Sequence, residues 1–108
     1  HVIENETNYN TYLHGEAVGI GMCMANALAV KLAFMSKDEE IRVKNLLERY
    51  DIPTTYKIKD VEDFYEHFFL DKKSLDNKIK FILPVGIGDC KITNEVTKDD
   101  VLNILKGF

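Results

Sequence analysis

The longest apolar run of the chain extends from Ala17 to Phe34 and predicts a long helix over residues 15–34. Within this run, Asn26 and Lys31 carry the only strongly polar side chains. A helix that has no polar face is normally buried on all sides in a globular domain. We therefore expect this helix to form the centre of the fold.

Three further helices are predicted from capping residues and from apolar positions at helical spacing. They are expected over residues 37–50, 61–70 and 98–106, after the capping residues Ser36, Asp60 and Thr97. Glu39 completes a capping box with Ser36. The apolar faces of the first two are expected to pack inward through Val43, Leu46, Leu47 and Tyr50, and through Val61, Phe64, Tyr65 and Phe68.

The remaining pattern predicts a small amount of sheet. Residues 79–85 are β-branched and partly alternating, and residues 90–92 form a second short strand after a turn at 86–89. Residues 1–6 read as the end of a helix. We expect a mainly α domain over residues 1–108 with a short two-stranded β-hairpin.

Composition narrows the class of protein. The net charge of −4 and the pI of about 5.3 argue against nucleic-acid binding, which usually needs a basic surplus. Residues 17–34 contain Lys31 and are rich in Gly and Ala, so we expect no membrane span. Cys23 and Cys90 match no zinc spacing and favour a cytoplasmic location. Because the chain begins with His1 and not with Met, we expect it to be a piece of a larger protein.

The polar residues at the start of the central helix are the strongest candidates for chemistry. His14 and Glu16 flank Gly15 where a helix N-terminus offers unpaired N–H groups and a partial positive charge. On these grounds His14 is either a metal ligand or acid–base group, or a plain contact at the helix N-terminus.

Other polar residues allow two interpretations each. His1 lies one helical turn before Glu4, whose carboxylate could orient its imidazole, or His1 is an exposed terminus. Lys72 and Lys73 are either a solvated turn or a clamp for a substrate anion. His67 is expected to be a helix-surface or boundary histidine.

Four motifs in order resemble the C-terminal half of the 3-dehydroquinate synthase family. The most specific lies at residues 13–22, which include His-Gly-Glu-Ala-Val. The others are His1-Val2-Ile3-Glu4, Asp71-Lys72-Lys73, and Phe81-Ile82-Leu83-Pro84 before Gly86-Ile87-Gly88. The resemblance implies a largely helical domain that packs against an N-terminal NAD-binding α/β domain across an active-site cleft.

The resemblance also implies an activity and its cofactors. The family enzyme converts 3-deoxy-D-arabino-heptulosonate 7-phosphate to 3-dehydroquinate and phosphate in the shikimate pathway. It uses NAD and a divalent metal, zinc or cobalt, and we expect a homodimer at full length. We expect the 108 residues alone to be inactive.

Site residues transfer by position in these motifs. His14 matches a metal ligand, whose partner histidine and glutamate would lie upstream of this chain. His1 matches a histidine that contacts substrate and is implicated in proton transfer. Lys72 matches the lysine region that binds a substrate anion, and Lys73 is the alternative.

Three rival interpretations remain open from the sequence. A related sugar-phosphate cyclase would share the metal and NAD machinery, whereas a glycerol-dehydrogenase-like enzyme would catalyse a different class of reaction. A non-catalytic helical interaction module would need no polar site at the start of the central helix.

Overall fold

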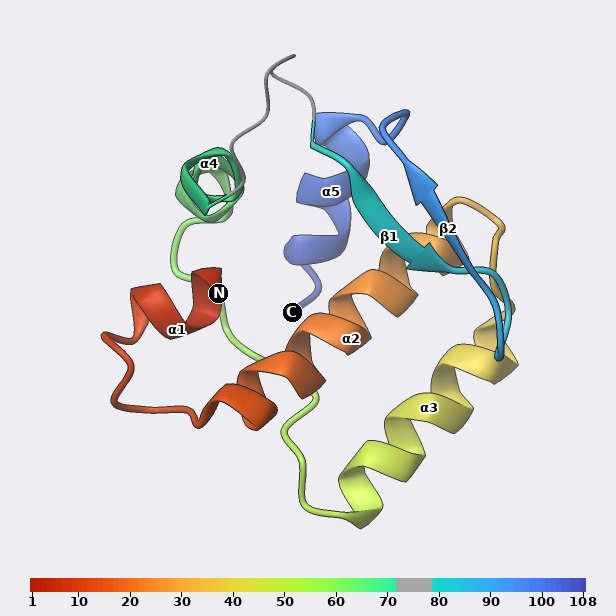
Figure 1. Ribbon diagram of the computed structural model, residues 1–108, viewed down its shortest axis with the longest axis horizontal. Helices are drawn as coiled ribbons and strands as arrows, with labels where there is room; N and C mark the ends of the chain where they lie inside the picture. Colours follow the sequence, from red (N-terminus) through yellow and green to blue (C-terminus); the bar gives the residue numbers. More distant parts are fainter. Residues whose placement is uncertain (72–78) are drawn as a thin grey trace.

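The computed structural model describes residues 1–71 and 79–108 (Figure 1). Within these ranges the chain forms helices and a two-stranded sheet, in an order that matches the predicted one. The elements are α1 (Val2–Glu6), α2 (His14–Lys31), α3 (Lys37–Arg49), α4 (Val61–Asp71), β1 (Phe81–Pro84), β2 (Cys90–Thr93) and α5 (Lys98–Leu105). The predicted fold class, mainly α with a short β-hairpin, is confirmed.

Helix α2 lies at the centre of the molecule, as its apolar sequence predicts. It contacts α1, α3, α5 and β1, and Ile20, Leu28 and Ala29 on it are almost fully buried (Figure 1). The expectation of burial on all sides is wrong, because Val18 and Met22 each remain 44% exposed. These two residues are four positions apart, as are His14 and Val18, so an exposed apolar strip extends along α2 from His14.

The predicted capping residues mark the helix starts. The Ser36 hydroxyl accepts from the Glu39 backbone N–H at 3.1 Å, and Glu39 accepts from the Ser36 N–H at 3.1 Å. Asp60 accepts from the Asp63 N–H at 3.2 Å. Thr97 caps α5 in the same way, because its hydroxyl accepts from the Asp100 N–H at 3.1 Å. Local chemistry thus determines where these helices begin.

Helix α3 packs less completely than its apolar spacing predicts. Leu47 is buried and Val43 half-buried, but Leu46 is 54% and Tyr50 69% exposed. Figure 1 shows α3 at the edge of the molecule, and among the described helices and strands it packs against α2. A helix packed on one neighbour buries a narrower stripe than one that lies in a core.

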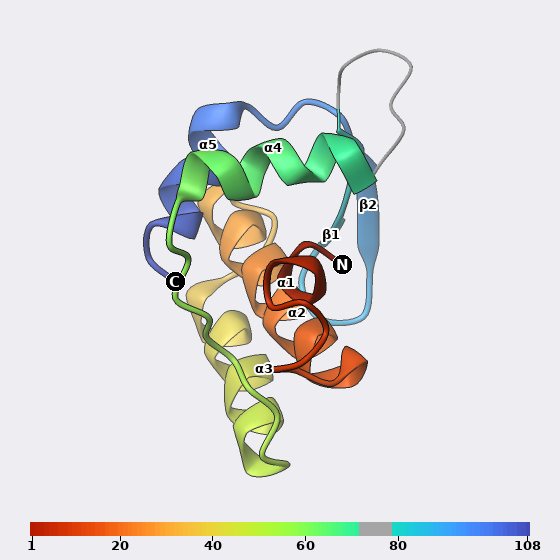
Figure 2. The same ribbon diagram turned by 90° about the vertical axis from the view of Figure 1, so that its left-hand side faces the viewer.

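Helix α4 carries the predicted aromatic stripe and crosses over α1 and α5 (Figure 2). Phe64 is 1% exposed and meets Phe68 edge to face at a centroid distance of 5.5 Å. Phe68 meets Phe81 of β1 in the same manner at 6.3 Å. These ring pairs join α4 to the hairpin.

The β-hairpin is antiparallel, with Ile82 opposite Ile92 and Leu83 opposite Lys91. Leu83 is buried against the core, whereas Ile82 and Ile92 face outward and are exposed. The turn needs Gly86, whose φ is +63°.

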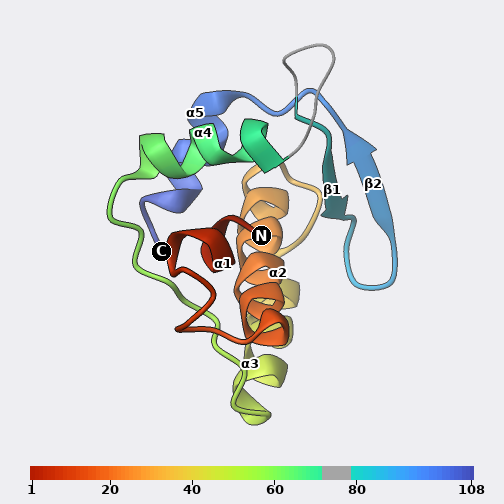
Figure 3. The same cartoon turned by 60° about the vertical axis from the view of Figure 1, so that its left-hand side comes forward.

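The position of α1 determines where the first residues lie. Figure 3 shows α1 beside α2, and Val2 and Ile3 are buried in the same core as Phe64 and Leu83. In the described parts of the chain, no helix combines the length and the apolar character needed to cross a membrane.

Candidate functional site

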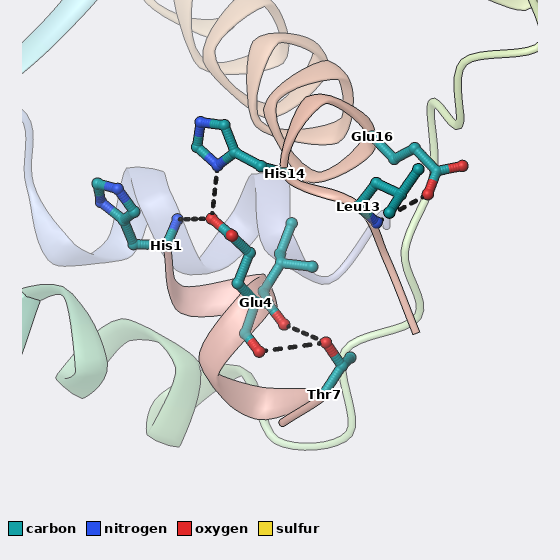
Figure 4. A network of polar contacts seen from close by, with 7 residues as sticks. His1, Glu4, Thr7, Leu13, His14 and Glu16 are labelled. Atoms are coloured by element: carbon teal, nitrogen blue, oxygen red, sulfur yellow. Dashed lines mark hydrogen bonds and ion pairs between the residues drawn. The ribbon is translucent and has the colours of Figure 1, made fainter. Parts of the chain in front are cut away.

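The start of α2 and the helix α1 bring a histidine and a carboxylate together (Figure 4). His14 is the first residue of α2, and its side chain is 67% exposed. Its Nδ1 lies 3.0 Å from Oε1 of Glu4, whose side chain is 11% exposed. An exposed imidazole is thus fixed by an almost buried carboxylate.

His1 lies against the same pair. The rings of His1 and His14 stack with centroids 6.2 Å apart and an interplanar angle of 24°. The backbone nitrogen of His1 is 3.9 Å from Oε1 of Glu4. The sequence allowed His1 to be oriented by Glu4 or to be an exposed terminus; His1 is exposed, and the ring that the Glu4 carboxylate contacts at 3.0 Å is that of His14. Spacing within one helix could not indicate this contact between two helices.

Glu16 has a structural task at the helix start. Its Oε1 accepts from the Leu13 N–H at 2.8 Å, which satisfies an otherwise unpaired backbone donor. Figure 4 shows Glu16 and the His14 ring pointing apart. Of the two polar residues that flank Gly15, His14 is therefore the one that faces α1.

Lys72 and Lys73 lie outside the described residues, so the substrate-anion assignment stays a prediction.

Among the described residues, the group that could offer three metal ligands lies elsewhere and consists of Glu6, Asp63 and His67, with ligand atoms within 4.8 Å of one another. His67 is half-buried, as expected for a boundary histidine, and its Nδ1 lies 2.7 Å from the Asp63 backbone carbonyl oxygen. Tyr56 already donates to Glu6 at 3.0 Å, and the Asp63 side chain is 60% exposed. These features are typical of a surface cluster, and we assign no metal to it.

The Tyr56 hydroxyl, which donates to Glu6, is partly shielded from solvent. Burial, and then the hydrogen bond to Glu6, raise the pKa of Tyr56 to about 12. Tyr56 therefore stays a neutral donor at physiological pH and ties α1 to the segment before α4.

An apolar cavity of about 370 Å³ begins beside His1, a feature that sequence reasoning missed. It extends between α1, α2, α4, β1 and α5, and Gly21, Phe64 and Leu83 are among its lining residues. At Gly21 an added Cβ would meet no atom of the described residues within 4 Å.

Comparison with solved structures shows which kind of protein shares this fold. The solved structure of ValA, the 2-epi-5-epi-valiolone synthase of Streptomyces hygroscopicus subsp. jinggangensis 5008 with NAD+ and Zn2+ bound, has a similar fold. It matches with a TM-score of 0.78 and 27% identity, over 89% of this chain and 27% of that chain. The fold is therefore that of a domain found in this synthase.

The family follows from sequence. A family model described as 3-dehydroquinate synthase C-terminal matches residues 1–74. The 3-dehydroquinate synthases of Sulfurovum sp. (strain NBC37-1) and Sulfurimonas denitrificans are 63% and 57% identical over all 108 residues. The chain belongs to the 3-dehydroquinate synthase C-terminal family. It spans about a third of these relatives, 31% of the length of each.

Proposed function

We propose that this chain is the C-terminal part of a 3-dehydroquinate synthase. The complete enzyme would convert 3-deoxy-D-arabino-heptulosonate 7-phosphate to 3-dehydroquinate and phosphate, a lyase reaction of the shikimate pathway. The observation that carries the proposal is 63% identity to a 3-dehydroquinate synthase over the whole chain. The 27% identity to ValA makes the related cyclase the second candidate.

His14 would hold the divalent metal, zinc or cobalt. The donor chemistry fits, because imidazole is a common ligand for both metals. Glu4 occupies Nδ1 at 3.0 Å, so Nε2 remains for a metal on an exposed face of the ring. One imidazole does not suffice for a site that needs three protein ligands. The other ligands would come from the rest of the longer protein.

His1 and Lys72 would act on the substrate. The stacking of His1 on His14 supports a place for His1 next to the substrate, where its ring would move a proton. Lys72, or else Lys73, would bind a substrate anion through its ammonium group.

NAD, when bound, would supply reversible oxidation of a substrate hydroxyl, and the metal would polarise substrate oxygens. NAD binding would belong to an N-terminal domain of the longer protein, packed on the face that carries His1 and His14. The exposed strip of Val18 and Met22 beside His14 supports this placement. The complete enzyme would be a cytoplasmic homodimer.

The test is a turnover measurement on a full-length protein that contains this chain, with NAD and zinc supplied. We expect 3-dehydroquinate and phosphate to form in equal amounts from 3-deoxy-D-arabino-heptulosonate 7-phosphate. A folded, metal-loaded and NAD-loaded protein that forms no dehydroquinate would refute the proposal.

A further inference from the structure

The contact between Glu4 and His14 joins two helices at the candidate metal site. It spans ten positions of sequence, and its 3.0 Å separation is that of a good hydrogen bond. A carboxylate oxygen accepts, so Nδ1 of His14 must be the donor and carry a proton. In a neutral imidazole the other nitrogen, Nε2, then keeps its lone pair.

We propose that Glu4 is a positioning residue that fixes the tautomer and the ring orientation of His14 for metal binding through Nε2. This inference rests on the proposed function, because it takes His14 as a metal ligand. Glu4 itself would not touch the metal or the substrate. Carboxylates that accept from the second nitrogen of a ligating histidine typically increase its basicity and hold its ring in place.

The surroundings of Glu4 make it suited to this task. Its side chain is 11% exposed, and its neighbours Val2 and Ile3 are 7% and 4% exposed in the core. The Glu4 carbonyl oxygen accepts from the Tyr9 N–H at 2.8 Å. The backbone that carries Glu4 is thus held against the core, and its side chain is almost buried where it meets His14.

The place of Glu4 beside α2 also suits an acidic side chain. The N-terminus of α2 carries a partial positive charge, which favours carboxylates near its first turn. Glu4 lies near this N-terminus on α1, and Glu16 lies there on α2 itself. The Glu4 carboxylate contacts the His14 ring, whereas the Glu16 carboxylate accepts from the Leu13 N–H. Loss of Glu4 would therefore leave the capping of α2 by Glu16 intact.

The experiment uses a full-length protein with Glu4→Ala, Glu4→Gln and a matched control, Glu6→Gln. Glu6 lies in the same helix, but its carboxylate accepts from Tyr56 and has no contact with His14 among the described ones. The first readout is zinc affinity in a chelator competition. We expect Glu4→Ala to weaken zinc binding by about 10–100-fold, the range for lost outer-shell partners. Glu4→Gln, which keeps a neutral acceptor, should weaken it less, and Glu6→Gln should leave it unchanged.

The second readout does not depend on metal. Nitrogen-15 NMR of the metal-free protein reports which ring nitrogen of His14 carries the proton. We expect Nδ1 protonation in the wild type and in Glu6→Gln, and a shift toward Nε2 protonation in Glu4→Ala. If Glu4→Ala does not fold, as shown by circular dichroism, Glu4→Gln is compared with Glu6→Gln by zinc affinity alone, and a smaller loss of affinity is expected.

The outcomes separate this inference from the proposed function. Wild-type zinc affinity and an unchanged His14 tautomer in a folded Glu4→Ala protein would overturn the positioning role, as would wild-type zinc affinity in Glu4→Gln if Glu4→Ala does not fold. Full zinc binding by His14→Ala would instead refute the ligand assignment on which the proposed function depends.

Discussion

At the scale of single residues, the approach of the 52–53 segment to α2 depends on Gly19. A Cβ at this position would collide with the Cγ2 atom of Ile52 and lie 3.3 Å from the Pro53 carbonyl oxygen. Gly21, one half-turn further on, meets no such neighbour among the described residues. The two glycines therefore have different roles in the same helix.

We predict that Gly19→Ala destabilises the domain and that Gly21→Ala does not. Alanine adds about 1 kcal/mol of helix propensity at either site. At position 19, overpacking against Ile52 costs about 1–3 kcal/mol and outweighs that gain. Urea denaturation followed by circular dichroism measures both effects. Equal stabilisation by the two substitutions would contradict the close approach at Gly19.

A second residue-scale prediction concerns the lysine pair. Lys72→Ala should weaken substrate binding by about 1.5–3 kcal/mol, the scale for a hydrogen bond to a charged group. NAD affinity should barely change. Steady-state kinetics of full-length Lys72→Ala and Lys73→Ala tests this. Normal kinetics for Lys72→Ala with a large loss for Lys73→Ala would show that Lys73 is the anion ligand.

Local signals in the sequence pointed to His14 as a member of the candidate site but could not predict that Glu4 contacts it. His14 stands out because it precedes a glycine at the start of an apolar helix. Its contact with Glu4 depends on how α1 packs against α2, which no local pattern encodes. The spacing of His1 and Glu4 suggested a pairing inside α1, because a local pattern shows only neighbours along the same helix.

At the scale of elements, the start of α3 and the tip of the β-hairpin share one side chain. Oε1 of Glu39 accepts from the Ser36 N–H, and Oε2 accepts from the Ile87 N–H at 2.9 Å. The backbone hydrogen bonds from Ser36 and then Ile87 lower the pKa of Glu39. The cap was predictable from Ser36 and Glu39, whereas its link to a turn 48 residues away was not.

This link gives a pH dependence with a definite sign. A carboxyl group with a lowered pKa in the folded state stabilises the fold above its ordinary value of 4.5. That contribution is lost as the pH falls through the lowered folded-state pKa. We predict that Glu39→Gln lowers the melting temperature at neutral pH and reduces the loss of stability on acidification.

The matched control is Glu40→Gln, because the Glu40 carboxylate pairs with Lys37 and not with the hairpin. Thermal melts of the two variants across the acidic range compare the sites. An identical pH profile for both variants would show that the Ile87 contact contributes nothing to stability.

The elements themselves were largely predictable, and the depth of their burial was not. Capping residues marked the helix starts at 37, 61 and 98, and each starts there in the structure. Leu46 and Tyr50 fit the helical spacing but remain exposed, because α3 lies at the edge. A periodic pattern shows which face can pack, but the arrangement of neighbours decides how much of that face is covered.

At the scale of the whole molecule, the helical core is continuous, but the described residues provide only part of the candidate metal site. Buried residues of α1, α2, α4, β1 and α5 form one cluster. His14 lies at its edge with an exposed ring, beside the exposed Val18 and Met22. The mainly α fold was predictable from apolar patterning, whereas the apolar cavity beside His1 arises only when distant elements pack together.

We predict that the 108-residue chain folds cooperatively but does not bind NAD saturably. Its core and capped helices support folding, and it has no Gly-rich dinucleotide site in its sequence. Circular dichroism during melting and calorimetric titration with NAD test the two parts. Tight NAD binding by the chain alone would contradict the proposal that another domain supplies that site.

The most direct test of the account is the metal content of a full-length protein with and without His14. We predict that the purified wild type holds about one zinc or cobalt ion per chain, as a site with three protein ligands should. His14→Ala should lose most of that metal and all dehydroquinate formation, while its circular dichroism spectrum stays unchanged. Stoichiometric metal in an active His14→Ala protein would contradict the central claim.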